Sequence, residues 1–366
     1  MGARLPSMSN GLPKLTTVLL SHRHRALFIL TISFVFFASV MFYWRTGQDT
    51  EGQLHSLITQ IRHEEFLPCH SHLTARGPPP SPGDIFFVET SDKTDPGYLF
   101  MCSVESTARM HPGTKVVVLM KGLANGNASL PSHLGLLLRC FPNMEIRPLD
   151  LLELFSGTPL AKWYLQSEHQ KEPYFLPVLS DACRITIMWK FGGIYLDTDF
   201  IVLKNLKNLT NVLGIESQNL LNGAFLSFKP KHEFMELCMK DFVENYNGWI
   251  WAHQGPGLLT RVFKKWCSIS NIQNNMMCKG MHALSPEAVY PIHWSNWKKL
   301  FEPISSSKLQ KLLKNTYAVH IWNKLSHGAR LNITSQAFLA QLYSQFCPAT
   351  YMKMKKDSEE QSRPAM

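Results

Sequence analysis

Two aspartates that directly follow a short apolar stretch constrain this chain more than any other feature. Residues 192–199 read GGIYLDTD. The glycines allow a tight turn after a helix, and the three apolar residues are too few for anything but a core strand. Side chains alternate along a strand, so Asp197 and Asp199 can point the same way. Two carboxylates on one face repel each other unless a cation lies between them, and Mg²⁺ and Mn²⁺ take such oxygen ligands. Asp-x-Asp is also common in ordinary turns, but a turn needs no apolar strand before it.

A helix with one charged pair is predicted just before the glycines. Residues 180–191 (SDACRITIMWKF) predict about three helical turns, capped by Ser180 and ended by Gly192. Asp181 and Arg184 are three residues apart and therefore neighbours on one helix face. The pair could be a weak surface ion pair, but the rest of the helix is apolar. We therefore expect it to face a site.

In this order, the charged helix pair, the glycines, the strand and the two aspartates resemble the DXD-sugar glycosyltransferases of family 32. The resemblance implies a nucleotide-sugar site. Asp181 and Arg184 would lie near the donor sugar, and Asp197 and Asp199 would hold Mn²⁺ and the diphosphate. The family's fold is of the GT-A type, a single nucleotide-binding α/β domain.

The residues before this block predict the same class of fold. Strands are predicted at 85–90, 115–120 and 144–149, and a helix at 97–110. Strands that alternate with helices indicate an α/β domain with a mostly parallel central sheet. Ligands bind such sheets at the carboxyl ends of the strands. We therefore expect Thr90 to lie at the same end of the sheet as the two aspartates and to bind the donor.

Two later stretches extend the resemblance. Residues 220–228 predict a strand interrupted by Asn222-Gly223, where a plain turn or bulge is the alternative. Retaining GT-A enzymes carry a strand of this kind beside the donor sugar, which implies donor binding by Asn222 and Gly223. In residues 251–260, a helix is expected to open at Pro256. Gln254 corresponds by motif to the glutamine beneath the anomeric carbon in related retaining galactosyltransferases.

A third metal ligand is expected at His320, in an apolar stretch over residues 316–323 that predicts a strand. A single histidine in such a stretch is more often a core residue. Metal sites of related retaining enzymes add a late histidine to the aspartate pair, and imidazole is compatible with Mn²⁺.

The resemblance covers about residues 83–348 and is most detailed for the family's α-1,4-galactosyltransferases. It implies transfer of galactose from UDP-galactose to the 4-hydroxyl of a terminal β-galactose with retention, and lactosylceramide as the acceptor, giving globotriaosylceramide. Catalysis would involve Gln254 and Asp181. No carboxylate is placed as an obvious nucleophile, so a front-side route is favoured over double displacement. Transfer of N-acetylglucosamine and glycoprotein acceptors remain alternatives. Trp249, Trp251 and Trp294 could stack on sugar faces or pack near the ceramide, but we expect buried packing.

Two other classes of function compete with transfer. Residues 197–203 also resemble the opening motif of haloacid-dehalogenase phosphatases, whose first aspartate attacks phosphorus. That motif usually begins its domain, whereas here more than a hundred residues precede it. The other alternative is an inactive, membrane-anchored binding module.

The N-terminal residues predict a membrane anchor. Residues 26–44 are uncharged and mostly apolar, and at 1.5 Å per residue they span roughly 28 Å, about one bilayer core. Basic residues precede this segment, so a tail at 1–25 is expected in the cytoplasm. Residues 45–83 are polar, then proline-rich, and predict a luminal stem. The catalytic domain would occupy 84–350, followed by a polar tail at 351–366.

Composition agrees with a secretory-pathway enzyme. The net charge is +10, but no basic run resembles a nucleic-acid arm, so phosphate substrates and membrane orientation explain it better. Sequons at Asn127, Asn208 and Asn332 fit a luminal body and a single-pass type II protein of the Golgi membrane. The sequence leaves open whether the chain associates with itself or with other glycosyltransferases.

The eight cysteines are expected to form several disulfides in an oxidising lumen. Cys267 and Cys278 could close a loop, and Cys183 is expected to be a buried free thiol.

Overall fold

The computed structural model describes Met41, residues 80–124 and residues 132–361. The chain divides into two compact units, Met1–Cys69 and His70–Met366, and the fold described below is that of the second. The predicted cytoplasmic tail, the membrane anchor apart from Met41, and the stem up to residue 79 lie outside the described residues, as does Asn127. Within the residues that are described, no helix has the length and hydropathy needed to cross a membrane.

The central element is an eight-stranded sheet with strand order β3-β2-β1-β4-β7-β6-β9-β8. The strands are β1 Ile85–Glu89, β2 Val116–Met120, β3 Met144–Pro148, β4 Gly193–Leu196, β6 Val212–Ser217, β7 Leu220–Phe228, β8 Met276–Cys278 and β9 Met281–Leu284. The pairs β1–β2, β2–β3, β1–β4 and β6–β9 are parallel, and β4–β7, β6–β7 and β8–β9 are antiparallel. The predicted α/β class with a mostly parallel central sheet is confirmed.

A second, two-stranded sheet joins distant parts of the sequence. β5 (Phe200–Val202) pairs antiparallel with β10 (Ala318–His320), and Phe200 lies opposite His320. Since β5 begins directly after Asp199, this pairing brings a histidine from the last fifth of the chain to the aspartates.

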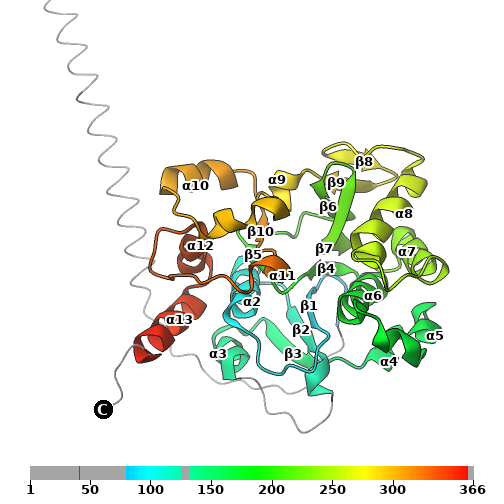
Figure 1. Ribbon diagram of the computed structural model, residues 1–366, viewed down its shortest axis with the longest axis horizontal. Helices are drawn as coiled ribbons and strands as arrows, with labels where there is room; N and C mark the ends of the chain where they lie inside the picture. Colours follow the sequence, from blue (N-terminus) through cyan, green and yellow to red (C-terminus); the bar gives the residue numbers. More distant parts are fainter. Residues whose placement is uncertain (1–40, 42–79, 125–131, 362–366) are drawn as a thin grey trace, which may run out of the picture. The chain divides into compact units, whose positions relative to one another are not determined.

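Helices cover both faces of the main sheet (Figure 1). The helices are α2 Tyr98–Met110, α3 Ser132–Cys140, α4 Leu151–Phe155, α5 Leu160–Tyr164, α6 Phe175–Lys190, α7 Glu233–Glu244, α8 Leu258–Cys267, α9 Pro286–Val289, α10 Ser306–Leu313, α11 Asn323–Ser326, α12 Phe338–Phe346 and α13 Pro348–Gln361. Four short turns complete the list: η1 Lys121–Leu123, η2 Ser167–Lys171, η3 His253–Gly257 and η4 Trp294–Phe301.

The alternation of side chains in β1 explains these two helical layers. Ile85 and Phe87 belong to a core that includes α2, α3 and α12, whereas Phe86 and Val88 belong to a core that includes α6, α7 and α8. Both faces of the strand are therefore buried, as expected for a central parallel strand.

The helix before the glycines begins earlier than predicted. α6 starts at Phe175, and Ser180 lies in its interior instead of capping it. Pro177 falls in the first turn, where a missing N–H costs no helical hydrogen bond. The predicted helix end is confirmed, since Gly192 and Gly193 both have positive φ. At the other terminus, residues 351–361, predicted as the start of a tail, continue α13.

The strand and helix expected later in the chain differ in detail. β7 runs through Asn222-Gly223, and its register with β6 shifts between Leu213 and Gly214, opposite this segment. The irregularity is therefore a bulge within one strand. Pro256 lies inside η3, and the helix itself, α8, begins at Leu258.

Two disulfides join cysteines that both lie in the described residues. Cys267–Cys278 closes the loop between α8 and β8, which confirms the proposed pair. Cys102–Cys347 joins α2 to the residue between α12 and α13 across 245 positions. Cys183 is a buried free thiol, as expected, and so is Cys238.

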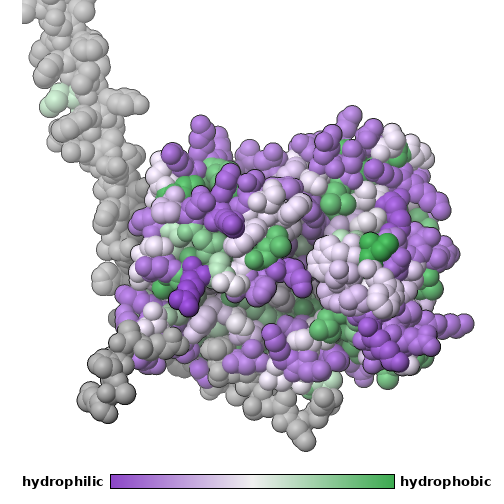
Figure 2. Space-filling view, in the orientation of Figure 1, coloured by the Kyte–Doolittle hydropathy of each residue, from purple (hydrophilic) through white to green (hydrophobic). Residues whose placement is uncertain are grey.

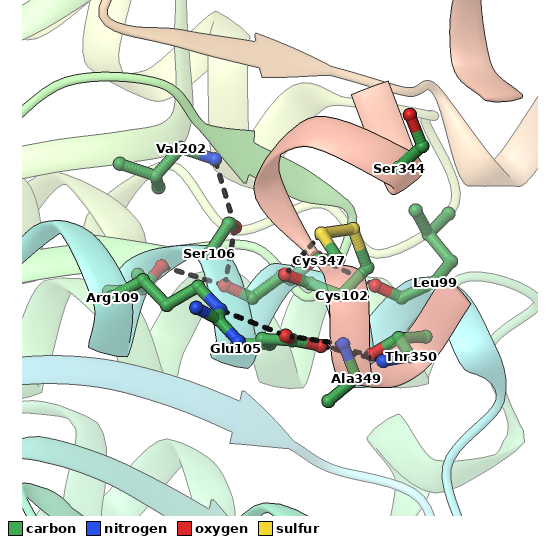
Figure 3. The surroundings of a disulfide bond; sticks show 12 residues. Leu99, Cys102, Glu105, Ser106, Arg109, Val202, Ser344, Cys347, Ala349 and Thr350 are labelled. Carbon is green, nitrogen blue, oxygen red and sulfur yellow. Dashed lines mark hydrogen bonds and ion pairs between the residues drawn. A yellow bond between two sulfur atoms is a disulfide. The ribbon is translucent and has the colours of Figure 1, made fainter. Parts of the chain in front are cut away.

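A buried glutamate holds the last helix to α2 (Figure 3). The side chain of Glu105 is fully buried, and its carboxylate accepts the backbone N–H groups of Ala349 and Thr350, each at 2.8 Å. It also accepts the hydroxyl of Thr350 at 2.7 Å and lies 2.9 Å from Nε of Arg109. These amides belong to the first turn of α13, where helices have unpaired N–H groups. A carboxylate from another helix thus caps α13.

We expect Glu105→Ala to lower the free energy of unfolding by about 2–4 kcal/mol, since it leaves the buried amides of Ala349 and Thr350 without their acceptor and removes the ion pair with Arg109. The melting temperature measured by calorimetry should fall by several degrees. Glu236→Ala, which removes an exposed carboxylate paired with Lys240, is the matched control and should change it little. Equal shifts in the two variants would contradict the capping role.

Candidate active site

The two aspartates lie at the carboxyl end of β4, where the chain leaves the main sheet for β5. The N–H of Asp197 donates to the carbonyl of Ala224 in β7 at 2.8 Å, so sheet pairing holds the first aspartate. The side chain of Asp197 is 25% exposed and that of Asp199 is 11% exposed. The first carboxylate therefore reaches toward solvent, whereas the second is enclosed.

His320 lies directly beside Asp199. Its Nε2 is 3.1 Å from Oδ1 of Asp199, and the other carboxylate oxygen accepts the N–H of Asn323 at 2.7 Å. Burial alone would lower the pKa of His320, but the carboxylate outweighs it and the pKa is raised. Burial alone would raise the pKa of Asp199, but His320 and the backbone hydrogen bonds hold it below its usual range. The two groups stabilise each other's charged forms.

These residues fit a divalent cation. Asp197, Asp199 and His320 each offer one ligand atom, and the three atoms lie within 4.8 Å of one another. Nδ1 of His320 is buried and has no hydrogen-bond partner among the described residues. Nε2 is the ring nitrogen that lies against Asp199. Two carboxylate oxygens and an imidazole nitrogen are compatible with Mn²⁺. The structure thus brings together all three predicted ligands, and the choice of Mn²⁺ stays a prediction.

Arg184 bridges the predicted donor-site carboxylates. Its Nη2 lies 3.1 Å from Oδ1 of Asp197, and its Nη1 lies 3.4 Å from Oδ1 of Asp181. Nη2 also donates to the hydroxyl of Ser180 at 3.0 Å, and the guanidinium lies over the ring of Tyr195, 5.1 Å from its centre. Burial by itself disfavours the guanidinium charge, but the adjacent carboxylates outweigh it and the pKa of Arg184 is raised. The charged pair of α6 faces the site, as expected.

Asp181 is the carboxylate beside Arg184 whose neutral form is favoured by burial. Burial raises its pKa to about 6, against the opposing effect of Arg184. Its carboxylate lies against the backbone of Gly255, where a Cβ atom would come within 2.6 Å of Oδ1. Gly223 similarly leaves room for the Arg184 side chain, since a Cβ there would lie 3.2 Å from Cδ of the arginine. Both glycines allow close packing around the charged pair.

Asn222 is held by its own neighbours. Its Nδ2 donates to Oε2 of Glu216 at 2.6 Å, and its Oδ1 accepts the N–H of Ala224 at 2.7 Å. Burial raises the pKa of Glu216. The asparagine therefore shapes the β7 bulge beside Asp197, and donor binding by Asn222 stays a prediction.

Thr90 occupies the expected edge of the sheet. β1 and β4 are parallel, with Phe86 opposite Tyr195. Thr90 directly follows β1 and Asp197 directly follows β4, so both lie at the carboxyl ends of paired parallel strands. The threonine is buried, so its predicted contact with the donor stays a prediction.

The surroundings of Gln254 do not match its predicted position beneath the anomeric carbon of the donor sugar. Its side chain is fully buried. Nε2 donates to the carbonyl of Phe242 at 2.8 Å, and Oε1 accepts the N–H of Asn247 at 3.4 Å. To reach a sugar, the amide would have to leave both partners. In this structure Gln254 supports the loop before η3, and its catalytic role stays a prediction.

Comparison with known proteins assigns the family. A family model described as the alpha 1,4-glycosyltransferase conserved region matches residues 227–354, and one described as the glycosyltransferase sugar-binding region containing DXD motif matches residues 97–220. Over 335 residues the chain is 60% identical to the lactosylceramide 4-alpha-galactosyltransferase of Homo sapiens, covering 90% of this chain and 93% of that protein. The chain belongs to the alpha-1,4-glycosyltransferase family.

Other relatives are more distant. The alpha-1,4-N-acetylglucosaminyltransferase of Homo sapiens is 35% identical over 283 residues, covering 75% of this chain and 82% of that protein. Among solved structures, the galactosyltransferase LgtC in complex with donor and acceptor sugar analogues matches with 16% identity and a TM-score of 0.38, over 73% of this chain and 95% of that chain. As a member of this family, the protein is a glycosyltransferase with a DXD motif, Asp197-Thr198-Asp199.

Sequence reasoning missed three groups of this glycosyltransferase site. The hydroxyl of Tyr195 donates to Oδ1 of Asp197 at 2.7 Å; its position two residues before Asp197 in a strand is a signal for this contact. The N–H of Asn323 binds Asp199, and Trp322 precedes it with a positive φ of 55°. Positive φ is uncommon for a bulky residue. It is retained here because the Trp322 indole donates to the carbonyl of Ile292 at 2.7 Å, and no sequence signal reveals it.

Because burial raises the pKa of Asp181, we expect Asp181→Asn to stabilise the folded enzyme while it lowers transfer. The folded-state pKa of about 6 lies above the unfolded value near 3.9, so the ionised carboxylate destabilises the fold at pH above about 6, by about 2–3 kcal/mol. This effect disappears as the group binds a proton between about pH 6 and pH 4. Melting temperatures at pH 7.5 and pH 4 should therefore show a gain only at pH 7.5.

The matched control is Asp150→Asn. Asp150 is an exposed cap of α4 that accepts the N–H of Glu153 at 3.0 Å, and asparagine caps helices equally well. A gain for Asp181→Asn of the same size at both pH values would contradict the assignment.

Proposed function

We propose that this enzyme transfers galactose from UDP-galactose to the 4-hydroxyl of a terminal β-galactose with retention, that lactosylceramide is its acceptor, and that globotriaosylceramide is its product. The observation that carries the proposal is the high identity, over most of the chain, to relatives named lactosylceramide 4-alpha-galactosyltransferase. The geometry of the site supports it, since the chain keeps a cation-binding group and a buried arginine beside one another.

Cleavage of the sugar–phosphate bond places negative charge on the departing diphosphate. Asp197, Asp199 and His320 would hold Mn²⁺ next to it, and the bound ion would neutralise part of that charge. Arg184 contributes a permanent positive charge in a largely buried place, where electrostatic stabilisation is stronger than in water.

Asp181 is suited to hold galactose hydroxyls. Its carboxylate faces Arg184 at 3.4 Å, which leaves its remaining acceptor capacity for hydrogen bonds from the sugar. Glu216 is buried, and its Oε2 accepts a hydrogen bond from Nδ2 of Asn222. This oxygen is therefore already occupied. With no free carboxylate assigned as a nucleophile, a front-side route in which the leaving phosphate deprotonates the acceptor remains our proposal for retention.

The N-acetylglucosaminyltransferase relative supports the alternative donor. The same site would bind UDP-N-acetylglucosamine if the space around C2 of the sugar admitted an acetamido group. Higher identity to the galactosyltransferases favours UDP-galactose.

The proposal is tested with the purified full chain, Mn²⁺ and UDP-galactose or UDP-N-acetylglucosamine, with lactosylceramide and a galactose-terminated glycoprotein offered side by side. We expect an α-1,4-linked galactose on lactosylceramide. Asp199→Ala should lower the rate by roughly 100-fold or more, and electron paramagnetic resonance should show weaker Mn²⁺ binding. Glu236→Ala is the control for removal of a carboxylate. A β-linked product, transfer only from UDP-N-acetylglucosamine, or near-normal transfer by Asp199→Ala would contradict the proposal.

We also propose a single-pass type II topology in the Golgi membrane, with the catalytic domain in the lumen. The apolar segment 26–44 after basic residues supports it, and so do the disulfides, which form in oxidising compartments. The sequon residues Asn208 and Asn332 are exposed, as acceptors of glycans must be.

We therefore expect glycosidase treatment of the protein from cells to reduce its apparent mass, and Asn208→Gln and Asn332→Gln each to remove part of that reduction. An unchanged mass would place the catalytic domain outside the lumen.

A further inference from the structure

Three consecutive large apolar side chains are exposed in the loop between α7 and η3. Trp249 is 68% exposed, Ile250 53% and Trp251 49%. The buried packing predicted for Trp249, Trp251 and Trp294 is therefore wrong, since Trp294 is also 44% exposed. Single exposed apolar residues are ordinary, but adjacent large ones on one loop mark an interaction surface.

The base of this loop is firmly held. The hydroxyl of Tyr246 donates to Glu172, and a Cβ at Gly248 would overlap the same carboxylate, so the chain packs closely there. The N–H of Trp249 donates to Oδ1 of Asn247 at 3.0 Å, which closes a local turn. The loop thus presents its apolar side chains from a fixed base, and their exposure is not the result of a loosely packed segment.

Neighbouring segments extend the apolar surface. The ring of Trp251 packs edge-on against Tyr174 with centroids 5.3 Å apart, and Nζ of Lys324 lies 5.6 Å from the Trp251 ring centre. We call this set the tip patch; its members are Trp249, Ile250, Trp251, Tyr174 and Lys324. In Figure 2, pale and green surface interrupts the purple surroundings between the positions of α11 and α7.

The tip patch adjoins both sides of the active site. Lys324 follows Asn323, whose N–H binds Asp199. On the other side, Trp251 lies four residues before Gly255, which packs against Asp181. Any surface that covers the tip patch therefore lies close to residues that contact Asp199 and Asp181, the carboxylates of the site.

We propose that the tip patch contacts the lipid bilayer that carries the acceptor. The inference rests on the proposed function in one respect, which is that the acceptor is a glycolipid held in a membrane. Tryptophan and aliphatic side chains with a lysine at their edge suit a membrane interface, where rings lie at headgroup level and the ammonium group meets phosphates. Lys324 has no ion pair among the described residues, so its charge is available. Glu172, the carboxylate at the loop base, is hydrogen-bonded and largely enclosed.

Contact between the tip patch and the bilayer would bring the active site close to its membrane-held acceptor. The galactose of a short glycolipid lies close to the headgroups, so the aspartates must approach the bilayer. A surface beside the active site that enters the interface would hold the site at that height and orientation, which raises the effective concentration of acceptor. A sugar-stacking subsite is the competing role for these rings, and the test below separates the two.

The first test measures depth in the bilayer. The full chain carrying Ile250→Cys, labelled with an environment-sensitive fluorophore, is reconstituted in phosphatidylcholine vesicles with and without brominated acyl chains. The described free cysteines, Cys183 and Cys238, are buried and should not react. We expect quenching of the label at position 250.

The control label is at Leu152→Cys. Leu152 is 60% exposed on α4, which contacts the Lys190 end of α6 through Glu153, about 20 Å along the helix from the end beside Tyr174. No quenching is expected there. Equal quenching at both positions, or none at position 250, would overturn the proposal.

The second test compares two acceptors of the same sugar. Trp249→Ser combined with Ile250→Ser should lower transfer to lactosylceramide in vesicles about 10-fold or more, while transfer to soluble lactose and the melting temperature stay unchanged. Leu152→Ser is the control. Equal loss with both acceptors would identify a sugar-binding surface and overturn the membrane role, as would no loss with either. If the unmodified enzyme uses neither acceptor, the proposed function fails, and the quenching result still decides whether the tip patch meets lipid.

Discussion

The position of the Arg184 guanidinium between Asp181 and Asp197 is the interaction on which the rest of the site depends. It lies 3.4 Å and 3.1 Å from the two carboxylates, in surroundings where an unpaired charge would be strongly destabilising. The helix, the strand and the β7 bulge must therefore adopt one arrangement that keeps all three groups together. Gly223 and Gly255 permit that arrangement, since a Cβ atom at Gly255 would come within 2.6 Å of the Asp181 carboxylate and one at Gly223 within 3.2 Å of the Arg184 side chain.

The second carboxylate depends on a different part of the chain. Asp199 receives His320 and the N–H of Asn323, both supplied by β10 and the turn that follows it. That turn places Trp322 at positive φ, an unfavourable conformation that persists because its indole donates to the carbonyl of Ile292 and also packs on His320, with centroids 4.2 Å apart. Strained backbone beside an active site is a familiar consequence of positioning such groups. The cation site is thus assembled by tertiary packing between segments 121 residues apart.

The C-terminal residues complete the domain and do not form a loose appendage. Glu105 caps α13, and Cys102–Cys347 joins the same two regions (Figure 3). α2 also meets the active-site segment, because Oγ of Ser106 accepts the N–H of Val202 in β5 and Oγ of Ser103 donates to the carbonyl of Thr198. α2 therefore links the end of the chain to the turn between the two aspartates.

The sequence by itself determined the α/β class, the strand that ends at Asp197, the charged pair on α6 and the Cys267–Cys278 loop. Each follows from local periodicity, turn chemistry or short spacing, which act between residues close in the chain. The family resemblance added His320. Only the tertiary structure decided that Gln254 is enclosed, that Glu105 caps α13 and that Trp249 and Trp251 are exposed. Burial and long-range hydrogen bonds depend on which distant segments meet, and neither residue type nor spacing specifies that.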